Sequence, residues 1–159
     1  RGIFMKARLF AALGIVALLV ATVMAEDKKE VKEVKLDGIK CPVSGGKATS
    51  NSVDYKGGKV YFCCDKCPTG FSKDTAKYAT KANAQLVATG QAKQAKCPLS
   101  GGPLNPDTAI TVGGAKVCFC CEKCQGKVKE AKDADALELV FSDKAFEKAE
   151  FKVPKAEKK

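Results

Sequence analysis

The sequence predicts a small α+β protein made of two tandem, cysteine-rich ββα units that follow a signal peptide. The first observation behind this prediction is a repeat: the segment VYFCCDKC at 60–67 recurs as VCFCCEKC at 117–124, with Cys120 lying 57 residues after Cys63. The second is a shared Cys-Pro-x-Ser-Gly-Gly segment, which begins at Cys41 in one copy and at Cys97 in the other. A fixed internal period determines the architecture. We therefore expect two units, residues 38–93 and 94–151.

The third observation is the small size of each unit. A unit of about 55 residues can barely be stabilised by an apolar core alone, and domains of this size often depend on a metal ion or on disulfides. Eight of the nine cysteines stand at positions that are cysteine in both copies, four in each. We expect these cysteines to hold the fold together.

Composition excludes several classes of site. The chain has no histidine, which rules out Cys2His2 zinc sites and catalysis by Ser-His-Asp or Cys-His groups. The formal net charge is +10, or +7 without residues 1–25. The lysines are spread along the chain without aromatic stacking platforms, so the pattern predicts a solvated surface and not a nucleic-acid-binding face.

The N-terminal segment has the pattern of a secretory signal. Met5 is the expected start, Lys6 and Arg8 form a basic region, and an apolar run at 9–20 precedes small residues ending at Ala25. The apolar run is short for a membrane span, so we expect residues 1–25 to be a cleaved signal peptide; an uncleaved anchor is the alternative. The mature chain would then be periplasmic or extracellular, without a membrane span. A charged leader follows at 26–37.

Each Cys-Pro-x-Ser-Gly-Gly segment is expected to form a tight loop, which we call the knuckle. The first unit is expected to contain a hairpin and a helix after its knuckle. Residues 52–55 and 60–62 are predicted strands joined by the Lys-Gly-Gly-Lys segment at 56–59. A helix is predicted at 69–81, and a further strand at 83–88.

The second unit repeats this order. The predicted strands are 108–112 and 116–119, separated by two glycines, and the predicted helix covers 125–132. Residues 137–141 are predicted to form a strand that corresponds to 83–88. A lysine-rich tail occupies 152–159.

The cysteine spacing is suited to a soft metal ion. In each copy, one cysteine in the knuckle can meet a cluster that lies between the end of a hairpin and the start of a helix. Thiolates that converge in this way bind zinc tetrahedrally or copper(I) trigonally, at about 2.3 Å. A helix N-terminus also stabilises thiolate charge. The candidate ligands are Cys41, Cys63, Cys64, Cys67, Cys97, Cys120, Cys121 and Cys124.

These residues resemble the TRASH/YHS group of heavy-metal-binding domains. The spacings are C-x21-C-x3-C and C-x22-C-x3-C, with VYFCC before a short helix in the first copy. The resemblance covers about 50 residues in each unit. It implies a treble-clef or zinc-ribbon-like unit that binds, senses or transports metal. It places the family's ligand positions at Cys41, Cys63, Cys67, Cys97, Cys120 and Cys124.

The sequence departs from the YHS pattern in two ways. The knuckle has Cys41 where that group has aspartate and Ser44 where it has cysteine, and the histidine of the group's name is absent. Cys64 and Cys121 are candidate fourth ligands. Neighbouring residues on an extended strand face opposite sides, so Cys63 and Cys64 can share one ion only if the chain turns between them.

Two other interpretations compete with metal binding. Outside the cytosol the four cysteines of each unit could form disulfides in any of three pairings. The protein would then be a disulfide-stabilised structural or interaction module without metal. The C-x-x-C pairs Cys64/Cys67 and Cys121/Cys124 also permit thiol-disulfide exchange, although the βαβ context of thioredoxin is missing. Cys118 stands at the position of Tyr61 and is expected to be a small buried residue and not a ligand.

The sequence therefore predicts an exported, non-enzymatic protein that sequesters, transports or senses a soft metal ion. We expect zinc or copper(I), one ion per repeat. An envelope metal transporter or a metalloprotein would be its partner.

Overall fold

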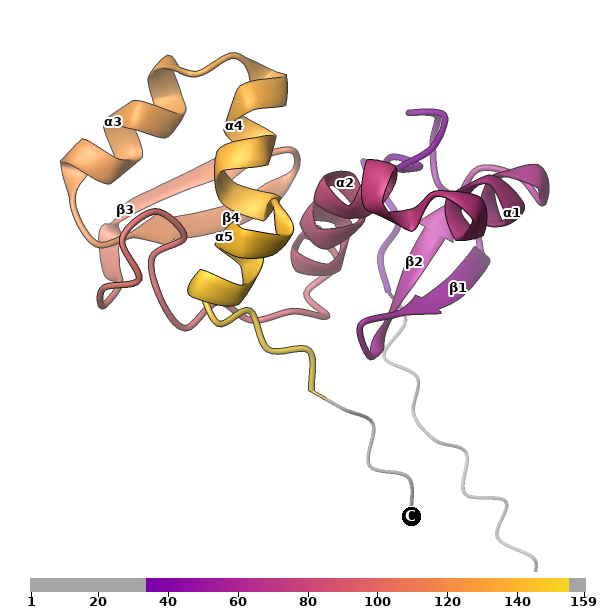
Figure 1. Cartoon of the computed structure of the whole chain (residues 1–159), viewed down its shortest axis with the longest axis horizontal. Helices are drawn as coiled ribbons and strands as arrows, with labels where there is room; N and C mark the ends of the chain where they lie inside the picture. Colours follow the sequence, from indigo (N-terminus) through magenta and orange to yellow (C-terminus); the bar gives the residue numbers. More distant parts are fainter. Residues whose placement is uncertain (1–33, 155–159) are drawn as a thin grey trace, which may run out of the picture. The chain divides into compact units, whose positions relative to one another are not determined.

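The computed structural model describes residues 34–154, and Figure 1 shows its elements. The predicted signal peptide, most of the charged leader and residues 155–159 of the tail lie outside the described residues. The described residues fall in one compact unit. We refer to residues 38–93 as the first half and to residues 94–151 as the second half.

The first half begins with the predicted hairpin. Strands β1 (Asn51–Tyr55) and β2 (Gly58–Phe62) pair antiparallel, with Asn51 opposite Phe62 and Tyr55 opposite Gly58. Lys56 and Gly57 both have positive φ angles, of 49° and 87°. Two such residues form the tight turn that suits the twist of a hairpin, so the predicted hairpin is confirmed.

Two helices follow the first hairpin. Helix α1 (Lys66–Lys73) starts two residues after Cys64 and includes Cys67, and helix α2 (Thr75–Ala88) follows it. Asp74 separates them: its backbone leaves the helical region, and its side chain accepts a hydrogen bond from the N–H of Lys77. This aspartate is an N-cap for α2.

The second half has the same order of elements and one further helix. Strands β3 (Asn105–Val112) and β4 (Ala115–Phe119) pair antiparallel around Gly113 and Gly114, with an irregularity between Asn105 and Ile110. Helices α3 (Glu122–Glu130), α4 (Asp133–Phe141) and α5 (Asp143–Lys148) complete the half. Both sheets therefore have two strands within the described part of the chain.

The strands predicted at 83–88 and 137–141 are wrong, because these residues form the ends of α2 and α4. In α2 the buried face includes Ala79, Ala82 and Leu86, which have the spacing of a helix face. In α4 the buried residues Ala136 and Val140 are four apart. Short apolar runs in sequence fit either structure, and here packing against the hairpins favours helix.

One apolar core spans both halves. Its largest fully buried side chains include Phe62 from β2, Phe119 from β4 and Phe141 from α4. Helix α2 contacts β2 of its own half and β4, α4 and α5 of the other half. Each cysteine cluster is thus attached to a core that neither hairpin could supply by itself.

The ends of the described region also pack against the rest of the chain. Val34 and Leu36, from the predicted leader, pack against a small cluster of Ile39, Ala48 and Tyr61. At the other end, Lys152 pairs with Lys93 through two backbone hydrogen bonds of 2.9 Å. Among residues 34–154, no helix has both the length and the apolar character needed to cross a membrane.

Candidate metal centre

Each knuckle is a closed loop that presents one buried cysteine. In the first half, the N–H of Cys41 donates to the carbonyl of Gly46 at 2.7 Å, and the N–H of Gly45 donates back to Cys41 at 2.9 Å. Gly45 has a φ angle of 76°, a conformation open to glycine at little cost. The second knuckle makes the equivalent bonds: the N–H of Cys97 donates to Gly102 at 2.9 Å, and the N–H of Gly101 donates to Cys97 at 2.8 Å.

The other cysteines lie in the short connection between a hairpin and a helix. Strand β2 ends at Phe62 and α1 begins at Lys66, so Cys63 and Cys64 lie in a bend and Cys67 lies in the first helical turn. The predicted helix start at 69 is thus three residues late. The chain does turn between Cys63 and Cys64, and their Sγ atoms are 3.8 Å apart.

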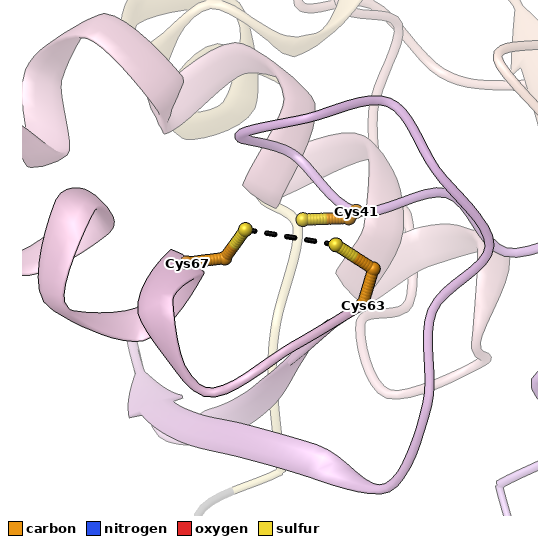
Figure 2. A group of neighbouring side chains, drawn as sticks. All are labelled: Cys41, Cys63 and Cys67. Carbon is orange, nitrogen blue, oxygen red and sulfur yellow. Dashed lines mark hydrogen bonds between the residues drawn. The ribbon is translucent and has the colours of Figure 1, made fainter.

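The knuckle and the bend bring three sulfurs together in each half. The Sγ atoms of Cys41, Cys63 and Cys67 all lie within 4.8 Å of one another, and we call these residues the first triad. Figure 2 shows their side chains pointing toward a common centre, with the sulfurs of Cys63 and Cys67 3.6 Å apart. Cys97, Cys120 and Cys124 form the second triad under the same distance limit.

These spacings fit a thiolate-bound ion. Sulfur atoms bound at about 2.3 Å are separated by about 3.8 Å in a tetrahedral site and by about 4.0 Å in a trigonal one. The Cys63–Cys67 separation of 3.6 Å is close to both values. Each triad could therefore hold one soft ion with small side-chain movements.

The fourth cysteine of each half lies at the exposed side of its triad. The Sγ atom of Cys64 is 3.4 Å from that of Cys67, and Cys64 is exposed to solvent. Cys121 is also exposed, with its Sγ atom 3.7 Å from that of Cys120. The knuckle cysteines are fully buried, so each cluster has a buried and an accessible side.

A knuckle serine forms a hydrogen bond with one triad sulfur in each half. The Oγ atom of Ser44 is 3.0 Å from the Sγ atom of Cys63 and accepts a hydrogen bond from the N–H of Gly46 at 3.2 Å. A hydroxyl oxygen can accept from the Cys63 thiol as well, so the single hydroxyl hydrogen of Ser44 is available to one neighbouring sulfur, that of Cys41 or that of Cys63. Ser100 has the same two contacts, with Cys120 at 3.1 Å and with Gly102 at 3.1 Å.

A buried glutamine joins the first knuckle to its hairpin. The side chain of Gln85 accepts from the N–H of Tyr61 at 2.6 Å and donates to the carbonyls of Tyr61 and Lys40 at 2.9 and 3.0 Å. It satisfies three backbone groups that would otherwise be unpaired. The residue before Cys41 is thereby tied to the strand that leads to Cys63.

A second glutamine has the same role in the second half. Gln94 accepts from the N–H of Cys118 at 2.9 Å and donates to the carbonyls of Cys118 and Lys96 at 2.7 and 2.9 Å. It comes from the segment before the knuckle, whereas Gln85 comes from a helix. Sequence reasoning missed both glutamines and both serines; of these, only the serines carry a local signal, since they recur in the repeated knuckle.

The knuckle environment favours a thiolate at its cysteine. Burial raises the pKa of Cys41, but hydrogen bonds from the Ser44 hydroxyl and from the backbone N–H groups around it outweigh burial and lower the pKa to about 6. Successive backbone N–H groups of this kind form an anion-binding nest. At Cys97 burial is likewise outweighed by the hydroxyl and backbone of Ser100, and the pKa is lowered to about 7.

The helix cysteine of each triad retains its proton. The pKa of Cys67 is raised to about 12 by hydrogen bonding to Cys64, by burial, and by its contacts with Cys63 and Cys41. Burial and the neighbouring sulfurs raise the pKa of Cys124 to about 12. Each triad without an ion thus combines a knuckle thiolate with a thiol that can donate a hydrogen bond.

All nine cysteines of the sequence lie within the described residues, and all nine are free thiols there. Cys118 was predicted to be a small buried residue and is only half-buried on β4. It lies outside the second triad.

Comparisons of the chain with protein-family models, with curated proteins and with solved structures gave no match. Function is therefore inferred from the two triads and their surroundings.

Proposed function

We propose that this chain is a metal-holding protein that carries one soft ion, zinc or copper(I), as cargo in each cysteine triad. The observation that supports this most is the pair of three-sulfur clusters, each with all its Sγ atoms within 4.8 Å of one another. Thiolate is the ligand class that selects copper(I) and zinc over magnesium or calcium. Three sulfurs suit trigonal copper(I), and the exposed side of each triad, where Cys64 or Cys121 lies, leaves room for the fourth ligand that zinc prefers.

We further propose a TRASH/YHS-type protein that acts after export, in sequestration, transport or sensing. The support is the C-x21-C-x3-C and C-x22-C-x3-C spacing, together with the order of knuckle, hairpin and helix in each half. An envelope metal transporter or a metalloprotein is the partner that fits a carrier of this kind. Holding an ion, and not catalysis, is the role proposed for the cysteines.

Native mass spectrometry of protein loaded with Zn²⁺ or Cu(I) under reducing conditions tests the proposal. We expect two ions in the wild-type protein, one in Cys63→Ser, and none in Cys63→Ser/Cys120→Ser, because these two cysteines belong to the sulfur clusters of both halves. Cys118→Ser is the matched control, since it removes a thiol outside both triads, and it should bind two ions. Retention of two ions by the double variant would contradict the proposal.

The same measurement distinguishes disulfide staples from metal sites. If the cysteines form disulfides, protein purified without reductant will contain no metal, and its mass will be lower by two hydrogens for each disulfide. That result would assign the cysteines a purely structural role.

A further inference from the structure

The first half contains a second group of three sulfurs that shares two members with the first triad. The Sγ atom of Cys64 is 3.8 Å from that of Cys63 and 3.4 Å from that of Cys67, and Cys63 and Cys67 are 3.6 Å apart. We call Cys63, Cys64 and Cys67 the outer triangle. It differs from the first triad only in that the exposed Cys64 replaces Cys41, which is 1% exposed.

Building on the proposed function, we propose that the outer triangle is the position at which the ion enters and leaves the first triad. The exchange partner is a small molecule or protein that holds the same ion through its own thiolates. Such a partner can reach Cys64 from solvent, whereas the knuckle shields Cys41 from direct attack.

The transfer is a sequence of ligand exchanges without a redox step. The Cys64 sulfur first bonds the ion and displaces one donor thiolate, and Cys63 and Cys67 displace the others. Each protein thiol that binds releases its proton to solvent. The Cys41 sulfur then bonds the ion while the Cys64–ion bond breaks, and Cys64 becomes free again.

The last step is a small one because the first triad and the outer triangle share Cys63 and Cys67. The bonds to Cys63 and Cys67 persist throughout, and one sulfur is exchanged for another. The sulfur separations of 3.4–3.8 Å in the outer triangle are within a few tenths of an ångström of those that a thiolate-bound ion needs. The ion therefore keeps at least three sulfur ligands from one position to the other.

The exposed side chain of Cys64 still turns back toward the cluster. Its Sγ atom is within hydrogen-bonding distance of that of Cys67, at 3.4 Å, at the start of α1. In the second half, Cys121 is the equivalent residue: it is exposed, 3.7 Å from Cys120, which is 3.6 Å from Cys124.

Stopped-flow transfer under anaerobic conditions tests the inference on the full chain. Cu(I) is offered as its bicinchoninate complex, and Zn²⁺ as its complex with 4-(2-pyridylazo)resorcinol. The absorbance of each complex follows the transfer of its ion. Substitutions beside metal ligands typically change metal affinity or activity about 10–100-fold. In Cys64→Ser we expect both capture and release of the ion to slow about tenfold for one of the two ions. In Cys64→Ser/Cys121→Ser, capture and release of both ions should be slow. Cys118→Ser is the control.

The alternatives give different results. If Cys64 is a fixed fourth ligand, Cys64→Ser will release its ion faster, as Cys67→Ser should, and this outcome would overturn the inference. If Cys64→Ser transfers ions at the rates of Cys118→Ser, the inference also fails, while the proposed function stands. If the wild-type protein takes up neither ion, both fail. Circular dichroism of each variant checks that it is folded.

Discussion

At the scale of single residues, the site depends on groups that do not bind the ion themselves. Ser44 occupies the knuckle position at which the resembling family has a cysteine, and it contributes a hydroxyl beside the sulfur of Cys63. Hydrogen bonds to metal-bound thiolates spread their charge and fix their orientation. The same arrangement of Ser100 and Cys120 in the second half argues that these contacts belong to the site.

Replacing Ser44 with alanine should therefore weaken metal binding without unfolding the chain. Loss of a hydrogen-bond donor beside a metal ligand costs about 10–100-fold in affinity, and we expect about tenfold for the first triad. Competition against a chromophoric chelator measures this change. Ser44→Thr, which keeps the hydroxyl, should bind nearly as tightly as wild type.

Ser72→Ala is the matched control for the serine variant. Ser72 is exposed on α1, and its hydroxyl donates to the carbonyl of Pro68 in its own helix. An equal loss of affinity in Ser44→Ala and Ser72→Ala would show that the hydroxyl at Ser44 has no specific role.

At the scale of elements, the geometry of each triad depends on how the knuckle is attached to the hairpin. No main-chain strand pairs with the outer edge of β2 or β4 in the described residues, and a glutamine side chain does so instead. Gln85 and Gln94 each satisfy both backbone groups of one strand residue and the carbonyl before the knuckle cysteine. This attachment fixes where the buried sulfur lies relative to the other two.

We expect Gln85→Ala to destabilise the fold strongly. The change leaves the N–H and the carbonyl of Tyr61 without their partner in a buried position, and each unsatisfied group costs about 1–3 kcal/mol. A loss of about 3 kcal/mol in the free energy of unfolding should appear in urea titrations under reducing conditions. Gln85→Glu should not recover it, because a buried carboxylate cannot donate to the two carbonyls that it would face and its charge is costly to bury.

Gln125→Ala provides the comparison for this variant. Gln125 is half-buried on α3, and its side chain makes no hydrogen bond within residues 34–154. If Gln85→Ala were no less stable than Gln125→Ala, the proposed attachment would be wrong.

Those parts of the elements that depend on neighbouring residues could be predicted from the sequence. The two-residue turns at Lys56–Gly57 and Gly113–Gly114 determine the hairpins, and turn residues of this kind are readable from sequence. The two triads follow from cysteine spacing once the hairpins are placed. The helical ends of α2 and α4 were not predictable, because a short apolar run fits a buried strand or a buried helix equally well.

The glutamine attachments could not be predicted for a different reason. Gln85 reaches Tyr61 and Lys40 across 24 and 45 positions of sequence, and no local pattern marks such a contact. Gln94 reaches Cys118 across 24 positions from a different kind of segment, so even the internal repeat does not align the two glutamines. Side-chain contacts of this range depend on tertiary packing.

At the scale of the whole described unit, the two halves are joined by a polar cluster beside the shared core. Lys56, in the turn of the first hairpin, forms an ion pair of 2.6 Å with Asp143 at the start of α5. The buried side chain of Asn83 on α2 donates to the same carboxylate and to the carbonyl of Phe141, both at 2.9 Å. The two halves, each with a proposed metal site, are thus connected by these polar contacts.

Asp143→Asn should reduce stability by less than about 1 kcal/mol at pH 7, because the ion pair is largely exposed. The hydrogen bonds from Lys56 and Asn83 lower the pKa of Asp143 below its ordinary value of 3.8. A carboxyl with a lowered pKa stabilises the fold above that ordinary value and loses its contribution as the pH falls below it. The difference between the variant and wild type should therefore shrink as the pH falls below the ordinary value of 3.8, which paired urea titrations would measure.

Asp54→Asn serves as the control, since Asp54 is exposed on β1 and makes no ion pair among the described residues. A difference for Asp143→Asn that persisted unchanged at pH 2 would mean that the charge of Asp143 does not join the halves.

The most direct test of the metal assignment is X-ray absorption spectroscopy at the edge of the bound metal in the full chain. Binding by the two triads predicts a first shell dominated by sulfur at about 2.3 Å, with at least three sulfur scatterers per ion. In Cys63→Ser/Cys120→Ser this sulfur shell should be lost. A first shell dominated by oxygen or nitrogen in the wild-type protein, or a sulfur shell that survives in the double variant, would contradict the assignment of the triads as metal sites.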